Sequence, residues 1–272
     1  MGGCEWVAIG AGAEAVRAPA VDSREGTHFL AIPVYSEQDD QETLRLFEGL
    51  RVADVSDGMD KVGLANRGLM SPEIQAAWKD TQHFTHRFIG IAVTARYVPT
   101  QRPPAAAMDG KAFDQWVADW YNTLSSEPFV PLIRKGTVVV IDDAPDSDVG
   151  TIGSNNIMGW RLRGCVGVVT DATARDTDEI AAEKAPLYFK RPGRGIRPGR
   201  NEIESVNRPI ECGGVLVMPG DVVVADGDGV IVVPRARAKE VADYARATLE
   251  GDKAGRRSLY QQLGLPSDDS VR

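Results

Sequence analysis

Cysteine is scarce in this sequence of 272 residues, which has only Cys4, Cys165 and Cys212 and no CxxC pair. An odd, widely spaced set argues against a disulfide scaffold or a zinc ribbon and is typical of a reducing compartment. A basic excess is also missing, since 31 Lys and Arg stand against 39 Asp and Glu, for a formal net charge of −8. This balance argues against nucleic acid as the main partner, because binding to phosphates needs a basic face.

Long apolar runs are absent as well, because no stretch approaches 18 uninterrupted apolar residues, and we therefore expect no membrane segment. The first 20 residues lack the basic start and long apolar core of a signal peptide, so we expect a cytoplasmic protein. Gly10-Ala11-Gly12 imitates the start of a dinucleotide-binding loop, but Pro19 ends any helix after a couple of turns. These features predict a flexible N-terminal extension over residues 1–28.

Hydrophobic residues make up 43% and charged residues 26% of the chain, as in ordinary globular proteins. Strands and helices alternate over residues 137–189, which predicts an α/β fold with parallel strands there. We expect one domain over residues 29–265 with mixed sheets and a C-terminal helical extension, followed by a tail at 266–272. Expected strands are 29–34, 88–98, 137–142, 166–170, 187–189, 203–206, 214–218, 221–225 and 230–233. Expected helices are 41–50, 53–62, 111–124, 154–163, 177–185 and 235–262.

Two local patterns refine this outline. Asp226-Gly227-Asp228-Gly229 lies between two β-branched runs and predicts a hairpin turn. The helix over 111–124 places several aromatic residues, including Trp116 and Trp120, on one face. Helical spacing of this kind favours a face packed on the core over a cofactor-binding surface.

The first candidate site is an acidic run directly after the strand at 137–142, made of Asp142, Asp143, Asp146 and Asp148. Ligands of open α/β sheets gather at the carboxyl ends of strands, and four carboxylates could recruit a hard cation such as Mg²⁺. Aspartate also favours turns through its own hydrogen bonds, and a solvated turn is the favoured interpretation.

The second candidate is the glycine-rich turn Gly150–Asn156, which precedes a predicted helix. Glycines allow backbone N–H groups to approach a ligand, and a helix N-terminus favours anions. A Gly-Lys-Ser/Thr sequence is missing, so the turn is not a nucleotide-binding P-loop. The alternative is that Ser154 or Asn155 simply caps the helix.

The third candidate is Arg175-Asp176, which follows the strand at 166–170. Arg175 offers a planar fork for a carboxylate, and Asp176 offers a hard oxygen ligand for a cation. The alternative is structural, because Asp176 with Glu179 matches a capping box and Arg175 could form an ordinary surface ion pair. The residues alone leave both interpretations open.

In this order, the three segments resemble the signature of the RraA-like family, which includes class II 4-hydroxy-4-methyl-2-oxoglutarate aldolases and oxaloacetate decarboxylases. The stretch 153–176, GSNNIMGWRLRGCVGVVTDATARD, matches the family pattern at Gly164, Gly167, Asp171, Arg175 and Asp176. The stretch 213–234, GGVLVMPGDVVVADGDGVIVVP, is similar to the family's C-terminal block. The resemblance covers about residues 45–260.

The resemblance implies a β/β/α swivelling-type domain assembled as a trimer or a hexamer, with sites at subunit borders. It implies a metal-dependent lyase that cleaves a small 2-oxo acid to pyruvate, by retro-aldol cleavage or by decarboxylation of oxaloacetate. Asp176 would hold Mg²⁺, Mn²⁺ or another divalent metal, and Arg175 would neutralise negative charge on the substrate. The substrate would also contact the turn formed by Gly153, Ser154, Asn155 and Asn156, while Asp171 would buttress its own turn.

Two positions depart from the family pattern. Ala172 replaces the usual glycine, and Ser154 stands where many aldolases carry Asp or Glu. The family also implies an acidic residue from a neighbouring subunit, for which Glu250 and Asp252 are the candidates. The alternative function is a non-enzymatic regulator that binds and inhibits an RNA-degrading nuclease.

Overall fold

The computed structural model describes residues 30–144, 148–268 and 270–271, and residues 32–272 form one unit. The extension expected over residues 1–28 and the acidic residue Asp146 lie outside the described residues. No helix in the described part of the chain is long and apolar enough to cross a membrane.

One mixed sheet forms the centre of the domain, in the order β1-β6-β4-β3-β2-β11-β12, with β8 also paired to β2. Strands β3, β4 and β6 are parallel, as the alternating pattern of residues 137–189 predicts, and β2 also runs parallel to β3. The remaining pairs of this sheet are antiparallel. The strands of this sheet are β1 (Gln75–Ala76), β2 (Phe88–Pro99), β3 (Thr137–Asp142), β4 (Cys165–Thr170), β6 (Leu187–Phe189), β8 (Asn201–Val206), β11 (Val222–Asp226) and β12 (Gly229–Val233).

Within the described residues, two small sheets and six α-helices accompany the central sheet. Strand β9 (Ile210–Cys212) pairs with β10 (Val215–Val217), and β5 (Thr173–Ala174) pairs with β7 (Arg191–Pro192). The helices are α1 (Glu37–Phe47), α2 (Val52–Lys61), α3 (Gly110–Thr123), α4 (Ser154–Arg161), α5 (Thr177–Ala182) and α6 (Ala238–Leu263), with short 3₁₀ turns η1 (Val130–Leu132) and η2 (Arg235–Arg237). Asp226 pairs with Gly229 across the turn between β11 and β12, which confirms the predicted hairpin.

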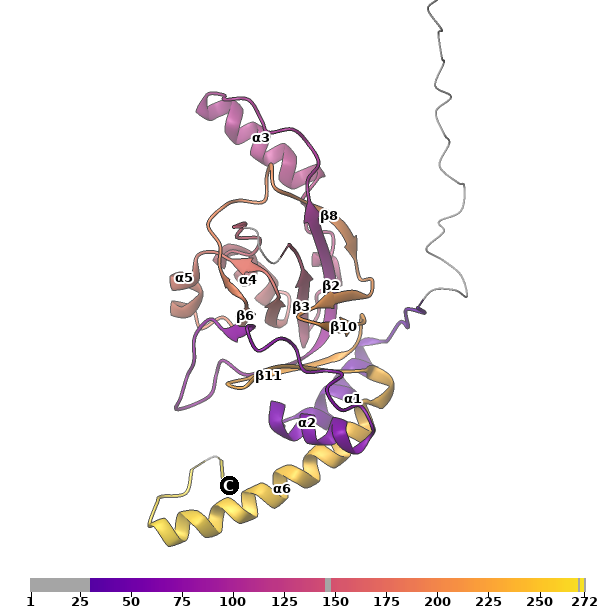
Figure 1. Ribbon diagram of the computed structural model, residues 1–272, viewed down its shortest axis with the longest axis vertical. Helices are drawn as coiled ribbons and strands as arrows, with labels where there is room; N and C mark the ends of the chain where they lie inside the picture. The colour runs from indigo at the N-terminus through magenta and orange to yellow at the C-terminus, as the bar shows by residue number, and fades with distance from the viewer. Residues whose placement is uncertain (1–29, 145–147, 269, 272) are drawn as a thin grey trace, which may run out of the picture. The chain divides into compact units, whose positions relative to one another are not determined.

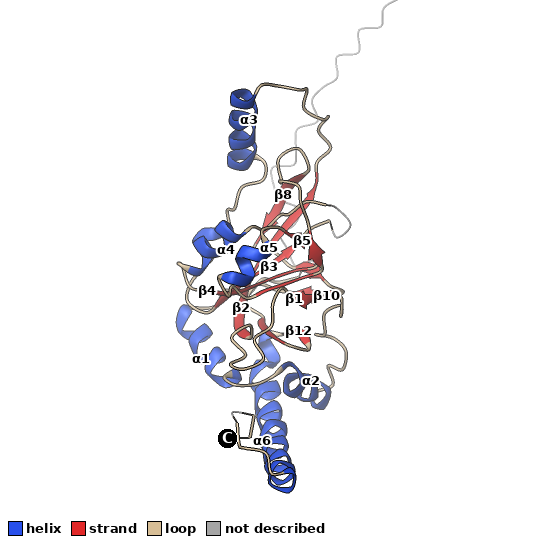
Figure 2. Ribbon diagram, turned by 90° about the vertical axis from the view of Figure 1, so that its left-hand side faces the viewer, coloured by secondary structure: helices blue, strands red, loops and turns tan. Residues whose placement is uncertain are grey.

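The central strands are buried on both faces, because their β-branched residues alternate between two apolar clusters. In β3, Val139 and Ile141 pack with α4 and α5, whereas Val138 and Val140 pack towards β9 and β10. A third cluster places α1, α2 and α6 against β11 and β12. Figures 1 and 2 both show α4 beside α5, well separated from α2 and α6. The sheet therefore holds the α4–α5 region apart from the terminal helices.

Helix α3 corrects the prediction of a packed aromatic face. Within this fully described helix, Trp120 alone is buried, and Phe113 is 42% exposed. The indole Nε1 of Trp120 donates to the Asn201 carbonyl at 3.1 Å, which attaches the C-terminal end of α3 to β8. In both ribbon views, the rest of the helix projects beyond the sheet (Figures 1 and 2). Part of the aromatic stripe meets the segment before β8, where a Cβ atom at Gly199 would lie 3.0 Å from the Trp116 ring.

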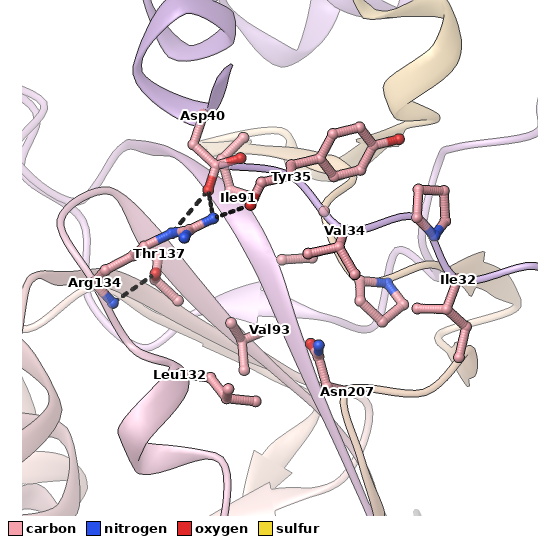
Figure 3. A pocket seen from close by; sticks show the side chains of 14 residues that line it. Ile32, Val34, Tyr35, Asp40, Ile91, Val93, Leu132, Arg134, Thr137 and Asn207 are labelled. Atoms are coloured by element: carbon pink, nitrogen blue, oxygen red, sulfur yellow. Dashed lines mark hydrogen bonds and ion pairs between the residues drawn. The ribbon is translucent and has the colours of Figure 1, made fainter. Parts of the chain in front are cut away.

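The strand predicted at 29–34 is also wrong over its described residues, since residues 30–36 pair with no strand. Pro33 has no N–H to donate to a ladder, and the chain instead enters α1 through a capping box formed by Ser36 and Asp39. The Tyr35 ring lies over Gly220, where a Cβ atom would come within 2.6 Å of the ring. A hollow of about 190 Å³ remains between residues 32–35 and β2 (Figure 3).

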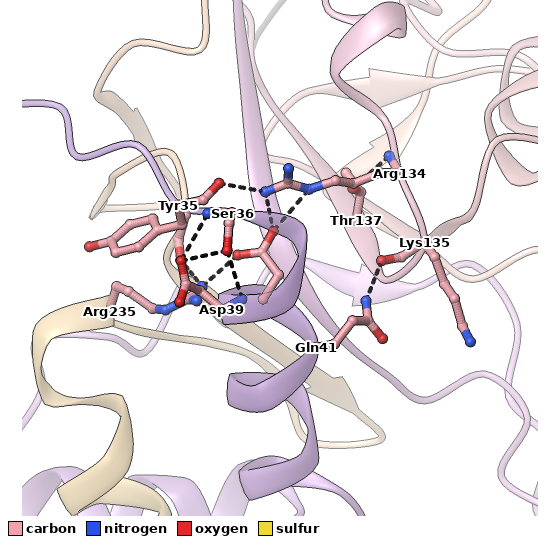
Figure 4. A network of polar contacts seen from close by, with 10 residues as sticks. Tyr35, Ser36, Asp39, Gln41, Arg134, Lys135, Thr137 and Arg235 are labelled. Atoms are coloured by element: carbon pink, nitrogen blue, oxygen red, sulfur yellow. Dashed lines mark hydrogen bonds and ion pairs between the residues drawn. The ribbon is translucent and has the colours of Figure 1, made fainter.

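The start of α1 is held by a buried carboxylate between two arginines. Asp40 is 3% exposed and accepts from Arg134 Nε at 3.0 Å and from Arg235 Nη1 at 2.9 Å. Arg134 also donates to the Tyr35 carbonyl at 3.0 Å, and the Arg235 guanidinium lies 4.4 Å from the Tyr35 ring centroid. Figure 4 shows this network, in which α1, the segment before β3 and η2 meet. One carboxylate therefore joins three segments that are distant in sequence.

Candidate functional site

The glycine-rich turn leads directly into α4. Gly153 is the N-cap residue, and its N–H donates to Asn156 Oδ1 at 3.1 Å. The side chain at the third helical position therefore closes the first turn, in place of the Ser154 or Asn155 cap that the sequence allowed. The amides of the first turn have no acceptor within the helix, so this terminus can meet an anion.

Arg175 and Asp176 lie next to this turn. A β-bridge joins Ile152 to Ala174, and Arg175 N–H donates to the Ile152 carbonyl at 2.8 Å. The Ser154 amide donates to Asp176 Oδ2 at 3.2 Å. Asp176 makes no side-chain cap bond to α5, so the capping-box alternative is wrong. The carboxylate instead faces the beginning of α4.

Two glycines make this approach possible. A Cβ atom at Gly153 would lie 2.6 Å from Asp176 Oδ2, and one at Gly150 would lie 2.6 Å from Arg175 Cβ. Asp176 itself has φ 58° and ψ 39°, a left-handed conformation that Asp and Asn adopt more readily than most residues. Any larger residue at either glycine would displace the Arg175–Asp176 pair.

Predicted site residues from both segments line one pocket of about 510 Å³. They are Gly153, Asn155, Asn156, Arg175 and Asp176, while the buried Ser154 contributes its backbone amide to Asp176. The side chains of Arg175 and Asp176 are 39% and 34% exposed, and Arg175 Nε lies 3.5 Å from Asp176 Oδ1. Both side chains are therefore accessible to a ligand, and the ion pair between them is long.

The sequence did not indicate three other residues of the pocket wall, Tyr121, Glu127 and Arg197. Arg197 is 5% exposed and donates to the Tyr97 hydroxyl at 2.6 Å and to Glu127 Oε1 at 2.8 Å. Burial raises the pKa of Tyr97. The glycine- and proline-rich stretch around Arg197 marks a turn, but no motif connects it to the Arg175 segment.

Comparison with known proteins decides the family. A family model described as RraA-like, Aldolase/RraA, matches residues 52–232. The chain belongs to the RraA-like family.

Individual relatives of this RraA-like protein are distant. A Halalkalibacterium halodurans protein, named as a candidate 4-hydroxy-4-methyl-2-oxoglutarate aldolase, is 32% identical over 129 residues, which cover 47% of this chain and 60% of that protein. An uncharacterized Pseudomonas syringae structure has a TM-score of 0.64 at 24% identity, covering 90% of this chain and all of the other. A Streptomyces coelicolor structure, described as an unusual member of the RNase ES inhibitor RraA family, has a TM-score of 0.61 at 20% identity over 84% of this chain and 98% of the other. The two structures establish the fold.

The acidic run of this RraA-like protein does not converge on one point. Asp143 is buried and accepts from the Thr151 hydroxyl and from Asn201 Nδ2, the latter at 2.9 Å. Asp148 pairs with the exposed Arg194, and Asp142 pairs with Arg96 at 3.2 Å. Among residues 30–144, 148–268 and 270–271, no group of three His, Cys, Asp or Glu side chains could hold a metal ion. Each described carboxylate of the run therefore has its own partner.

Asp142 gives this segment a pH-dependent contribution to stability. Burial, reinforced by Asp171 and Glu211 and opposed by Arg96, raises the pKa of Asp142 to about 7. A raised pKa in the folded state stabilises the fold at low pH, and this contribution is lost as the pH rises through about 7. We therefore expect the melting temperature of Asp142→Asn to rise relative to that of the wild type when the pH is raised from 5 to 8.

Thermal melts at both pH values measure this change, and Asp148→Asn is the control. Arg194 lowers the pKa of Asp148, so Asp148 stays ionised over this range and the difference from the wild type should remain constant. A constant difference for Asp142→Asn as well would show that Asp142 is already ionised at pH 5 in the folded protein.

The remaining predicted residues lie outside the pocket. Asp171 Oδ2 accepts from the Gly213 amide at 3.2 Å and so ties its turn to the β9–β10 hairpin, as the buttressing role predicts. Ala172, in place of the family glycine, is buried. Glu250 and Asp252 lie on α6, and Asp252 pairs with Arg51 at 2.9 Å in the same chain. Their contribution to a neighbouring subunit stays a prediction.

Proposed function

We propose that this RraA-like protein is a divalent-metal-dependent carbon–carbon lyase that cleaves a small 2-oxo acid to pyruvate. The reaction would be retro-aldol cleavage or decarboxylation of oxaloacetate, both of which leave negative charge on the former carbonyl oxygen. The observation that carries the proposal is the placement of Arg175 and Asp176 against the glycine-backed N-terminus of α4, in one pocket. The name of the Halalkalibacterium relative supports the same chemistry.

The residues present fit a magnesium ion better than a metal that needs several protein ligands. Asp176 is one-third exposed at the pocket wall and has a carboxylate oxygen 3.5 Å from its nearest cation, Arg175 Nε. Mg²⁺ is commonly bound by one or two carboxylates, with water and substrate oxygens as its other ligands. When bound, such an ion would act as a Lewis acid towards the 2-oxo group. Asp176 would hold it.

The chain's own groups would bind and stabilise the developing charge. Arg175 presents a planar fork of donors that matches a carboxylate or an enolate oxygen. Asn155 and Asn156 lie in the first turn of α4, where backbone N–H groups have no acceptor within the helix. These amides would cradle the substrate while the Ser154 amide orients Asp176. The proposal includes a homotrimer or hexamer in which Glu250 or Asp252 reaches the site of a neighbour.

A pyruvate-release assay tests the function. Oxaloacetate and a panel of branched 2-oxo diacids would be incubated with the full chain, with Mg²⁺ and with a chelator. We expect release of pyruvate that requires the metal. A protein that binds Mg²⁺ but releases no pyruvate from any compound would contradict the lyase and favour the alternative, a non-enzymatic inhibitor of an RNA-degrading nuclease. Ser154, in place of an acidic residue, is the feature that favours this alternative.

Metal binding should depend on Asp176. We expect Asp176→Asn to weaken Mg²⁺ binding by about tenfold or more, because the neutral amide removes the charged oxygen ligand. Asn tolerates the left-handed conformation at this position, so the backbone should be preserved. Isothermal calorimetry measures the affinity, and Asp178→Asn, an exposed carboxylate in the first turn of α5, is the matched control. Equal affinity in both variants would remove Asp176 from the site.

A further inference from the structure

Glu127 occupies an unusual position in the pocket wall, because three donors from two other segments converge on its carboxylate. Oε1 accepts from Asn156 Nδ2 at 2.6 Å and from Arg197 Nη2 at 2.8 Å, and Oε2 accepts from the Trp160 indole at 3.0 Å. The Glu127 side chain is 20% exposed. An ionised carboxylate is acceptor-only and can satisfy all three donors, whereas an amide has one acceptor oxygen and cannot.

The contact between Glu127 and Asn156 affects Asp176 through the first turn of α4. The Asn156 amide that donates to Glu127 also accepts, through Oδ1, from the Gly153 N–H at 3.1 Å. Glu127 therefore fixes the orientation of the group that closes the first turn of α4. The next amide in that turn, Ser154 N–H, donates to Asp176 Oδ2. A shift of Asn156 would move the donor that orients this carboxylate.

The second contact of Glu127 is with Arg197. Arg197 is 5% exposed, and its Nε has no hydrogen-bond partner within the described part of the chain. Its guanidinium lies 5.2 Å from the Tyr97 ring centroid and 5.0 Å from that of Tyr121, which comes from α3. Glu127 supplies its charged partner at 2.8 Å. A buried cation without this carboxylate would be displaced towards water.

We propose that Glu127 is the positioning residue of the pocket, which sets both the α4 terminus facing Asp176 and the Arg197 guanidinium. Its oxygens are directed at protein donors, so it acts through Asn156 and Arg197 and not on the substrate itself. The expected effects on turnover rest on the proposed lyase function. The expected effect on Mg²⁺ binding does not require turnover.

The primary test replaces Glu127 by Gln, which keeps the shape and removes the charge and one acceptor. We expect Mg²⁺ affinity, measured by calorimetry without substrate, to fall about tenfold, the lower end for partners of metal ligands. We expect kcat to fall about 10- to 100-fold with a smaller change in KM, because the groups that Glu127 positions would no longer be held in the geometry that the reaction needs. The pH profile of kcat/KM should keep its shape.

The matched control is Glu202→Gln. Glu202 is a carboxylate of β8, paired with Arg102 outside the pocket, with a side chain 27% exposed. A merely structural role for Glu127 would lower the melting temperature in both variants and leave Mg²⁺ affinity and kcat the same in both. That result would overturn the proposal. Loss of one limb of the pH profile in Glu127→Gln would also overturn it, because Glu127 would then be an acid or base acting on the substrate.

A double-mutant cycle tests whether Glu127 acts through Asn156. Coupled residues give non-additive effects, so Glu127→Gln combined with Asn156→Ala should bind Mg²⁺ no more weakly than the more impaired single variant. Additive losses would overturn this route. If Glu127→Gln does not fold, Asn156→Ala alone decides, since it removes the same contact, and unchanged Mg²⁺ affinity would overturn the proposal.

The two proposals fail in different ways. A wild-type protein that binds Mg²⁺ without releasing pyruvate overturns the lyase, and the calorimetric comparison still decides the role of Glu127. A wild-type protein that releases pyruvate while Glu127→Gln behaves like Glu202→Gln overturns only the positioning role. A wild-type protein with neither Mg²⁺ binding nor pyruvate release overturns both.

Discussion

Replacement of Arg175 by Lys is expected to lower kcat/KM for oxaloacetate or an aldol substrate by about 100-fold or more, the scale of one lost transition-state donor. Lys keeps the positive charge but loses the planar fork. A guanidinium that faces developing enolate charge interacts more strongly with the transition state than with the ground-state ketone. The aliphatic part of Arg175 lies over Gly150, so Lys can occupy the same path without steric conflict.

Steady-state kinetics and thermal melts on the same preparation test this expectation. Folding should be little affected, because Arg175 is 39% exposed and its ion pair with Asp176 is long. The control is Arg194→Lys, because the Arg194 side chain is 88% exposed and pairs with Asp148 outside this pocket. Normal turnover in Arg175→Lys, or an equal loss in Arg194→Lys, would remove Arg175 from the catalytic residues.

The largest loss of stability is expected for Asp40→Ala. Removing one partner of a buried ion pair leaves an unpaired buried charge, here Arg235, whose side chain is 8% exposed. The Arg134 side chain is 39% exposed and can turn to water. We therefore expect a loss of folding free energy near the lower end of the range for broken buried ion pairs. A loss of about 3 kcal/mol corresponds to a melting temperature lower by about 6–12 °C in a protein of this size.

Denaturant and thermal unfolding of Asp40→Ala measure this loss, and Asp243→Ala is the control. Asp243 pairs with Lys239 on the exposed face of α6, with side chains 61% and 77% exposed, so its removal should leave the melting temperature nearly unchanged. Kinetic constants of Asp40→Ala below its melting temperature should match the wild type, because Asp40 does not line the candidate site. A melting temperature equal to that of the control would show that the network contributes no net stability.

Much of the sheet and half of the pocket could be predicted from local sequence. The β-branched runs of β2, β3 and β4 are long enough to specify strands. Alternation with helices from residue 137 onward predicted that β3, β4 and β6 are parallel. Parallel neighbours end at the same edge of a sheet. The turn at Gly153 and the pair Arg175-Asp176 therefore meet although about 20 residues separate them.

The other half of the pocket could not be predicted, because it depends on segments with no periodic or motif signal. Glu127 lies in an irregular segment before η1, and Arg197 lies in a turn before β8. The contact between Glu127 and Arg197 depends on how the loops cross the ends of the strands, and no single stretch of sequence specifies this. The prediction that α3 packs its aromatic face on the core was wrong for a related reason. Periodicity predicts an apolar face, but how much of that face another segment covers depends on the rest of the fold.

The sparse attachment of α3 has a consequence for how this protein can diversify. Substitutions at exposed positions usually change stability by about 0.5 kcal/mol or less, and most of α3 is exposed. Tyr121 and Asn122, near its anchored end, nevertheless line the pocket. Substitutions in this helix can therefore change one part of the pocket wall, while the turn that carries Arg175 and Asp176 stays the same.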